Sequence, residues 1–401
     1  MLALAWLFSA NRRQFPFRVV FWGVALQFGF ALLILRSEPG RHVFAASQSA
    51  VEHFIAFAGE GTSMVFGPLA DPAALRNGFG AANGVILAVG ILGTIVLVSA
   101  ASSILYHYGL LQRVVRGIAW AMRRTMGTSG SETLSAAANI FMGQTEAPLV
   151  IRPYLPTLTR SEVLAVMTGG MSTIATSVLG AYVSFGIPAG HLLTASVLSA
   201  PAGLAIAKIM LPETEASQTM GASTAEVPRE TVNGLDALCQ GAADGLRLAL
   251  NVIAMLVASV SLLAAVNWML SHAIGWAGID VATPLQTLFA WANRPIAWIL
   301  GVPSRDCAAI GEILGERIVL NEFVGYLHLS RIRDTLDPRS HLLAVYALCG
   351  FANFGSIAIQ IGGIGALAPV RRGDLARLGF RSMFAGLLAC YMTACVVGVL
   401  T

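Results

Sequence analysis

Long uncharged stretches are the feature of this sequence that most limits what it can fold into. Val85 to Tyr106, Leu248 to Ser271 and Met383 to Leu400 carry no charged side chain, and Val19 to Leu35 is a fourth such stretch. A helix needs roughly 17 to 25 residues of this kind to cross a bilayer. The chain of 401 residues is 56% hydrophobic and 11% charged, more apolar than a soluble fold of this size can bury. We therefore expect an all-α integral membrane protein with several spans.

The arginines gather between the apolar stretches. Loops rich in Arg and Lys stay on the cytoplasmic side, so these clusters report topology. They explain the net charge of +4 without an anionic partner, and we expect no binding of nucleic acid. In the opening MLALAWLFSANRR the arginines follow the apolar residues, the reverse of a cleavable signal peptide, which indicates the tail of a short first helix. The residues expected to face the cytoplasm are Arg12, Arg13, Arg18, Arg113, Arg116, Arg123, Arg124, Arg371, Arg372, Arg377 and Arg381.

Two later segments are apolar but too interrupted for ordinary spans. Residues 131–158 hold two arms of roughly a dozen residues around GQTE, too short for two spans at about 1.5 Å per residue. Residues 304–332 repeat this plan around NEF. Each is followed by spans, at 163–207 (divided by GIPAG) and at 341–369 and 383–400. We predict a multi-span helical bundle with two re-entrant hairpins and discontinuous helices in an inverted repeat, the plan of a secondary transporter.

Each predicted hairpin carries an acid at its interruption. Pro148 suits the first turn of the second arm, which places Glu146 at the start of that arm. Glu322 lies in NEF. An unpaired charge inside a membrane costs several kcal/mol on insertion scales, so both acids are candidate functional residues. The structural alternative is a salt bridge, with Arg152 or Arg317 as the partner.

Neutral polar residues surround these acids and a third interruption, CGFANFGSIAI. Such donors and acceptors serve recognition of a neutral, polyhydroxylated or heterocyclic solute better than charge pairing. The stretches contain no arginine, which a transporter of dicarboxylates would need. The polar residues are Gln144, Thr145, Asn321, Asn353 and Ser356; Gly355 helps to interrupt the third stretch, and Phe351 offers an aromatic face.

Other chemistries find little support in the sequence. No nucleophile with a base, metal set or phosphate loop accompanies the acids, so we expect no enzyme. The cysteines form no CxxC, and no His or Cys pair has zinc spacing, so neither a disulfide framework nor a metal site is supported. We interpret the five cysteines as small packing residues: Cys239, Cys307, Cys349, Cys390 and Cys395.

From about Asn11 to its end, the chain resembles the concentrative nucleoside transporters. The stretches that carry the resemblance are GQTEAPLVIRPYLPTLT, STIATSVLGAYVSFGIP, HLLTASVLSAPA, NEFVGY and CGFANFGSIAIQIGG. The resemblance implies a homotrimer in the inner membrane of a bacterium, with a fixed scaffold and a mobile transport domain. It implies scaffold spans and an interfacial helix in 1–107, the first half of the transport domain in 108–211, a loop and central scaffold span in 212–272, and the second half in 273–401.

The resemblance also implies the binding residues. Nucleobase contacts map onto Gly143, Gln144, Thr145, Glu146 and Val178. Ribose contacts map onto Glu322, Asn353 and Ser356, with Phe351 lining the pocket. A co-transported sodium ion would be held by Asn139, the carbonyl of Met142, Thr173 and the carbonyl of Ile174. An alternative for Thr173 is a hydroxyl bonded back to its own helix.

The predicted function is sodium-coupled uptake of nucleosides by alternating access. Two alternatives remain open: proton coupling, and an uncoupled facilitator whose flux never exceeds equilibrium. The chain departs from the family pattern in two places. After FAN and one further residue, some relatives have two serines, whereas this chain has Gly355 and Ser356. Its first span is also short. The preference for purine or pyrimidine nucleosides is left open.

Overall fold

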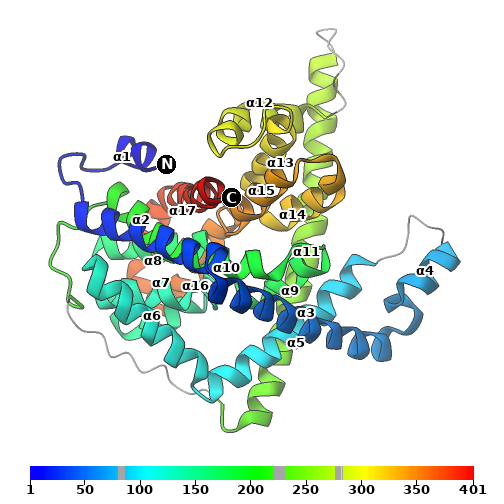
Figure 1. Ribbon diagram of the computed structural model, residues 1–401, viewed down its shortest axis with the longest axis horizontal. Coiled ribbons are helices and arrows are strands. Elements are labelled where there is room, and N and C mark those ends of the chain that lie inside the picture. Colours follow the sequence, from blue (N-terminus) through cyan, green and yellow to red (C-terminus); the bar gives the residue numbers. More distant parts are fainter. Residues whose placement is uncertain (80–85, 221–230, 276–280, 282) are drawn as a thin grey trace.

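The computed structural model of the chain describes residues 1–79, 86–220, 231–275, 281 and 283–401, and the regular structure in them is entirely helical (Figure 1). Val85, the start of one predicted span, and 221–230, half of a polar loop between the halves, lie outside the described residues. The α-helices are α1 (Leu2–Leu7), α2 (Phe17–Ala31), α3 (Glu38–Phe66), α4 (Pro72–Phe79), α5 (Leu87–His107), α6 (Leu110–Met126), α7 (Gly130–Ala138), α8 (Arg160–Ser172), α9 (Thr176–Ser184), α10 (Ala189–Met210), α11 (Gly234–Gly275), α12 (Pro284–Ile299), α13 (Cys307–Val319), α14 (Glu322–Ile332), α15 (Pro338–Leu348), α16 (Phe354–Leu367) and α17 (Arg372–Leu400).

Six helical stretches of the described chain are long and apolar enough to cross a membrane, which agrees with the expected multi-pass architecture. The predicted central span, 248–271, is part of the much longer α11, and α17 begins well before the predicted span at 383–400. The six stretches are Phe17–Arg36, Leu87–His107, Arg160–Ser184, Ala189–Met210, Gly234–Gly275 and Pro369–Leu400.

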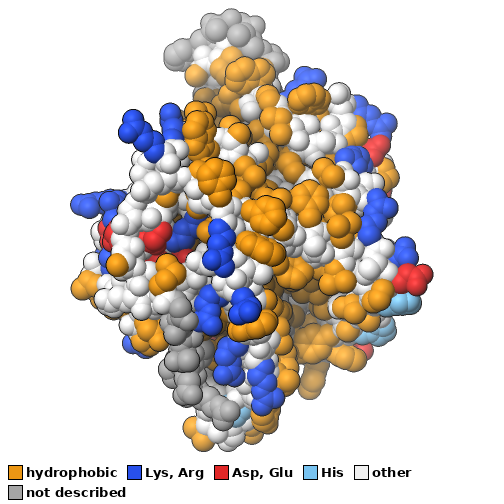
Figure 2. All heavy atoms as spheres, turned by 60° about the vertical axis from the view of Figure 1, so that its left-hand side comes forward, with side chains coloured by type: hydrophobic (Ala, Val, Ile, Leu, Met, Phe, Trp, Pro, Cys, Tyr) orange, Lys and Arg blue, Asp and Glu red, His pale blue; other side chains and the backbone are white. Residues whose placement is uncertain are grey.

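The six stretches differ sharply in how much protein covers them. The most apolar window of Gly234–Gly275 is 11% buried and that of Phe17–Arg36 is 22% buried, whereas that of Arg160–Ser184 is 94% buried. Exposed large side chains such as Phe17, Val257 and Trp268 belong to the poorly covered helices. Figure 2 shows apolar side chains spread widely over one face of the molecule. These helices therefore form the periphery, with α8, α9 and α10 in the interior.

Both interrupted segments contain two short arms. In the first, α7 starts with a capping box of Ser129 and Glu132, and the second arm is the 3₁₀ helix η4 (Ala147–Thr157). The second arm is 3₁₀ rather than α-helical, and Pro153 and Pro156 inside it do not fit an α-helix interior, because each lacks an amide hydrogen and its ring clashes with the carbonyl four residues earlier. In the second segment α13 and α14 are separated by Leu320 and Asn321. Re-entrance and the inverted repeat stay predictions.

Helix α12 was not expected from the sequence. Its apolar residues are interrupted by Asn293, Arg294 and Pro295, so its sequence does not have the pattern of a membrane-spanning helix. It packs closely on α13: a Cβ added to Gly315 would lie 2.3 Å from the Cβ of Phe289. The cysteine interpretation needs one correction, because Cys239 is exposed, whereas Cys307, Cys349 and Cys390 are buried and Cys395 is half-buried; all five are free thiols.

Candidate functional site

Glu322 is buried at the start of α14, where the second interruption brings three segments together. Asn321 caps that helix, its side-chain oxygen accepting a bond from the Val324 amide at 3.0 Å. The Glu322 carboxylate accepts hydrogen bonds from the Tyr182 hydroxyl of α9 at 3.0 Å and from the Asn353 amide at 3.0 Å. The acid is thus held by neutral donors, which a ligand hydroxyl can replace.

Asn353 extends this network toward the first hairpin. It caps α16 by accepting from the Ser356 amide at 2.9 Å. The Ser356 hydroxyl accepts from Gln144 Nε2 at 3.1 Å, and Gln360 Nε2 donates to Gln144 Oε1 at 3.1 Å. A continuous hydrogen-bonded chain therefore runs from Glu322 through the third interruption to the tip of the first hairpin. It unites four of the residues predicted to bind substrate.

The rest of the GQTE tip packs beside this chain. The Gly143 amide donates to Glu146 Oε2 at 3.1 Å, and Glu146 stands at the start of η4, as the sequence predicts. Thr145 packs against α16, since a Cβ added to Gly363 would lie 2.6 Å from Thr145 Cγ2. Val178 is buried in the apolar core, and Phe351 is partly buried against the same core.

Glu146 is exposed to a cavity of about 290 Å³ between helices that lie far apart in the sequence. One wall comes from the first hairpin and α9, including Met142, Leu149 and Arg152. The other comes from α5 and α11. The buried Glu322 and Asn353 are not among the described residues that line the cavity. The polar side chains of the second wall include Ser99, Ser102, Ser103, Gln240 and Asp244.

The structure does not support salt bridges as the reason for the two acids. Within the described residues, no Lys, Arg or His nitrogen lies within 4.0 Å of a carboxylate oxygen of Glu146 or Glu322. Arg317 is fully buried but donates to the carbonyls of Ala347 at 2.8 Å and Gly350 at 3.1 Å. It therefore holds the end of α15 at the third interruption.

The residues predicted to bind sodium lie where α7 and α8 end. Asn139 is completely buried, and its amide donates to the Ser135 carbonyl at 3.0 Å while its Oδ1 has no hydrogen-bond partner. The Thr173 hydroxyl donates to the Gly169 carbonyl at 3.0 Å, which is the alternative considered above. A Cβ added to Gly169 would lie 3.2 Å from Asn139 Nδ2, so the two helices touch here.

These groups have the chemistry that an alkali cation requires. The carbonyl oxygens of Met142 and Ile174 accept no hydrogen bond from another described residue, and Thr173 keeps lone pairs while it donates. Three oxygens therefore have no hydrogen-bond donor among the described residues: the buried Asn139 Oδ1 and the two carbonyls. The segments that carry them meet, since the Thr176 amide donates to the Phe141 carbonyl at 3.1 Å. A buried oxygen acceptor without a donor is unfavourable, and a cation would relieve it.

Three residues of this region were not singled out from the sequence. Tyr182 and Gln360 join the network through partners 140 and 216 residues away, and Arg317 was considered only as an ion-pair partner. Tyr182 lies in the stretch STIATSVLGAYVSFGIP, and Gln360 follows the third interruption. Their positions inside otherwise apolar segments were the available signal.

Comparison with known proteins gives matches along nearly the whole chain. Family models described as the N-terminus and the C-terminus of Na⁺-dependent nucleoside transporters match residues 1–69 and 191–398, and a gate model described as nucleoside recognition matches 88–189. An uncharacterized transporter of Haemophilus influenzae is 42% identical over 405 residues, covering 100% of this chain and 95% of the relative.

Two further matches carry more specific names. Sodium/nucleoside cotransporter 1 of Rattus norvegicus is 40% identical over 418 residues, covering 100% of this chain and 62% of the rat protein. The structure of CNTnw in an inward-facing substrate-bound state has a TM-score of 0.94 and 36% sequence identity, covering 100% of this chain and 95% of that chain. The chain has the same fold as CNTnw.

Proposed function

Because the chain belongs to the Na⁺-dependent, concentrative nucleoside transporter family, we propose that it is a symporter that takes up nucleosides with sodium. The family consists of transporters, so the protein is not an enzyme, and it is a multi-pass membrane protein. The observation that carries the proposal is the hydrogen-bonded chain from Glu322 to Gln144, since it connects both hairpin tips next to an unpartnered Asn139 oxygen.

In this proposal the nucleoside replaces hydrogen bonds within that chain. Ribose hydroxyls donate to Glu322 in place of Tyr182, and Asn353 and Ser356 supply further polar contacts beside Phe351. Gln144 can both donate and accept, as the edge of a nucleobase requires. The remaining nucleobase contacts come from Gly143, Thr145, Glu146 and Val178.

Sodium is the second substrate. Asn139 Oδ1, the Thr173 hydroxyl and the carbonyls of Met142 and Ile174 provide the hard oxygen ligands that it needs. The Phe351 amide donates to the Thr173 carbonyl at 3.3 Å. Since Phe351 also lines the proposed ribose site, this bond gives a direct route by which occupancy of the ion site can influence substrate binding.

Transport proceeds by movement of a transport domain against a scaffold. The contrast between the poorly covered α11 and the buried α8 supports this division. The cavity that Glu146 lines has one wall from the first interrupted segment and α9 and another from α5 and α11, and we assign these walls to the transport domain and the scaffold. The exposed apolar length of α11 suits a homotrimer in the lipid bilayer, and we assign the protein to a bacterial inner membrane.

Uptake of radiolabelled uridine into proteoliposomes tests the proposal. The purified chain is compared under an inward sodium gradient, an inward proton gradient and no gradient. Accumulation with sodium alone is the expected result. Accumulation with protons alone would reassign the coupling, flux that never exceeds equilibrium would favour the facilitator, and absence of any nucleoside flux would refute the function.

A further inference from the structure

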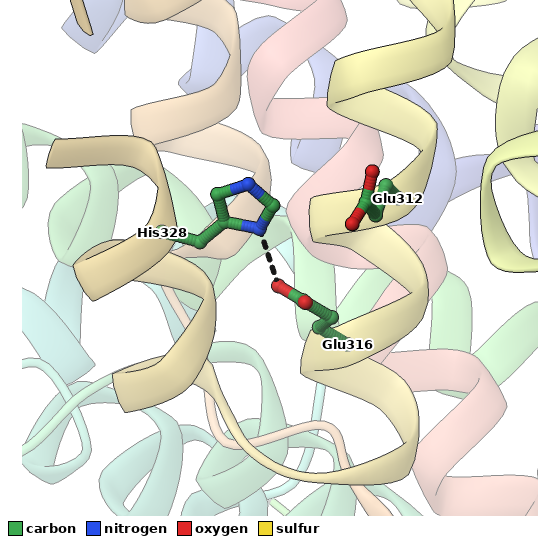
Figure 3. Close-up of side chains that lie close together, drawn as sticks. All are labelled: Glu312, Glu316 and His328. Atoms are coloured by element: carbon green, nitrogen blue, oxygen red, sulfur yellow. Dashed lines mark hydrogen bonds and ion pairs between the residues drawn. The ribbon is translucent and has the colours of Figure 1, made fainter. Parts of the chain in front are cut away.

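The second hairpin carries a cluster of three potential metal ligands away from the sites described above. Glu312 and Glu316 project from α13 and His328 from α14 (Figure 3). One ligand atom from each lies within 4.8 Å of the other two. His328 Nδ1 is 2.8 Å from Glu316 Oε2. The spacing in the sequence is not that of a zinc motif, so only the folding of the two arms brings the set together.

An ion pair accounts for two members of this set but leaves the third unexplained. Within the described residues, the Glu312 carboxylate has no hydrogen bond and no ion pair. It lies one helical turn from Glu316, whose side chain is only 6% exposed. Two carboxylates at this spacing repel each other when both are ionised. The one hydrogen bond and ion pair that the His328 ring makes among the described residues is with Glu316, so no cation is bonded to both carboxylates.

We propose that Glu312, Glu316 and His328 bind one divalent transition-metal ion, with Zn²⁺ as the best fit. Carboxylate oxygens together with one imidazole nitrogen suit zinc, whereas calcium and magnesium prefer oxygen ligands alone. In a tetrahedral zinc site each ligand atom lies about 2.0 to 2.1 Å from the ion. The ligand atoms are then closer to one another than the most distant pair of ligand atoms in this cluster. The unpartnered Glu312 side chain is free to close that distance.

The site is open enough to be loaded from outside. The His328 side chain is 26% exposed and Glu312 is partly exposed, so the ion can enter and keep a water molecule as its fourth ligand. Because the ligands come from both arms, the ion would fix α13 against α14. Glu322 begins α14, so the same ion would stiffen the arm that presents the proposed ribose ligand.

Zinc binding by the purified full-length protein, with any affinity tag removed, tests this assignment. Isothermal titration with ZnCl₂ should give one site per chain, weaker at pH 5.5 than at pH 7.5 because protons compete for the imidazole. Glu312→Gln should weaken zinc binding at least tenfold. Since Glu312 has no hydrogen bond or ion pair to another described residue and lies one turn from Glu316, the same variant should not lower the Tm of the zinc-free protein.

A matched variant and a second readout make the test decisive. Glu60→Gln changes an exposed glutamate of α3 and should leave zinc affinity unchanged. Zinc should raise the Tm of the unmodified protein and of Glu60→Gln but not that of Glu312→Gln. Equal zinc affinity in Glu312→Gln, His328→Asn and the unmodified protein would overturn the proposal, as would an equal loss in Glu60→Gln. None of these readouts depends on transport.

Discussion

Glu322 is the residue whose chemistry is easiest to separate from its role in folding. Glu322→Gln keeps the size of the side chain but removes the charge that strengthens a bond from a ribose hydroxyl. We expect binding of uridine to weaken by about 1 to 3 kcal/mol, the value of a lost charge-assisted hydrogen bond, while a dideoxy analogue is affected far less. Competition against radiolabelled uridine measures both. Equal losses for the two ligands would contradict the ribose assignment.

Thr173 distinguishes an ion ligand from a hydroxyl that merely bonds to its own helix. Thr173→Ala should raise the sodium concentration needed for half-maximal uridine uptake, because one oxygen ligand is lost. Thr125 offers a matched control, since its hydroxyl donates to the Ala121 carbonyl at 2.9 Å on α6. Sodium titration of uptake compares the two variants. An unchanged sodium requirement in Thr173→Ala would remove this residue from the ion site.

Single residues could be predicted where their chemistry conflicts with an apolar segment. Glu146, Glu322 and Asn353 stand out for this reason, and the structure places all three at interruptions. Tyr182 could not be assigned a role, because its hydroxyl donates to Glu322, a residue 140 positions away in the sequence. A tyrosine in an apolar helix is otherwise ordinary. The sequence therefore indicates which residues are unusual more readily than which residues meet.

At the scale of elements, the third interruption depends on a buried cation. Arg317 donates to the carbonyl of Ala347, which the ending of α15 leaves without a helical partner, and to the carbonyl of Gly350 just beyond that helix. Arg317→Met should lower the Tm and weaken uridine binding, because hydrogen bonds to a charged donor are worth about 1.5 to 3 kcal/mol each.

Two further variants distinguish this role from a general sensitivity to lost charge. Arg317→Lys can still donate to one carbonyl and should recover part of the lost stability. Arg41→Met changes an exposed arginine of α3 and should leave the Tm unchanged. Thermal unfolding in detergent, with and without uridine, measures each variant. A normal Tm and normal uridine binding in Arg317→Met would show that the third interruption is stable without the Arg317 hydrogen bonds.

The positions of the elements were more predictable than their internal geometry. Gly and Asn mark each interruption, with Pro148 added at the first, so the existence of short arms follows from the sequence. Pro153 and Pro156 argue against an α-helix in η4, but proline alone does not specify what replaces it, so the 3₁₀ form does not follow from the sequence. Helix α12 was missed because contacts with α13, not hydrophobic length, hold it in place.

At the scale of the whole molecule, the sequence cannot show which helices form the interior. Apolar composition is similar in Gly234–Gly275 and Pro369–Leu400, with hydropathy values of 2.3 and 2.1, yet their windows are 11% and 78% buried. An apolar helix can be surrounded either by lipid or by other helices, so its composition does not indicate how much of it is buried in the protein. The division into scaffold and transport domain thus came only from the family resemblance, and it leads to a prediction about movement.

The cavity beside Glu146 allows that movement to be tested. Ser102 lines it from α5 and Leu149 from η4, so cysteines at both positions, in a Cys239→Ser background, can be joined by a cleavable thiol cross-linker. If the two walls move past each other, cross-linking should reduce uridine uptake at least tenfold and cleavage should restore it. Retained uptake in fully cross-linked protein would contradict the proposed movement.

A cross-linker could also block the cavity simply by filling it, and a second pair removes that ambiguity. Ser102 and Gln240 line the same cavity but both belong to the wall formed by α5 and α11. These two helices pack closely, since a Cβ added to Gly241 would lie 2.6 Å from Ser103 Cβ. Cross-linking this pair should therefore preserve most uptake. Loss of uptake in both cross-linked pairs would indicate that the cross-linker blocks the cavity. Loss of uptake only in the pair with Leu149 would require that the first hairpin move relative to α5.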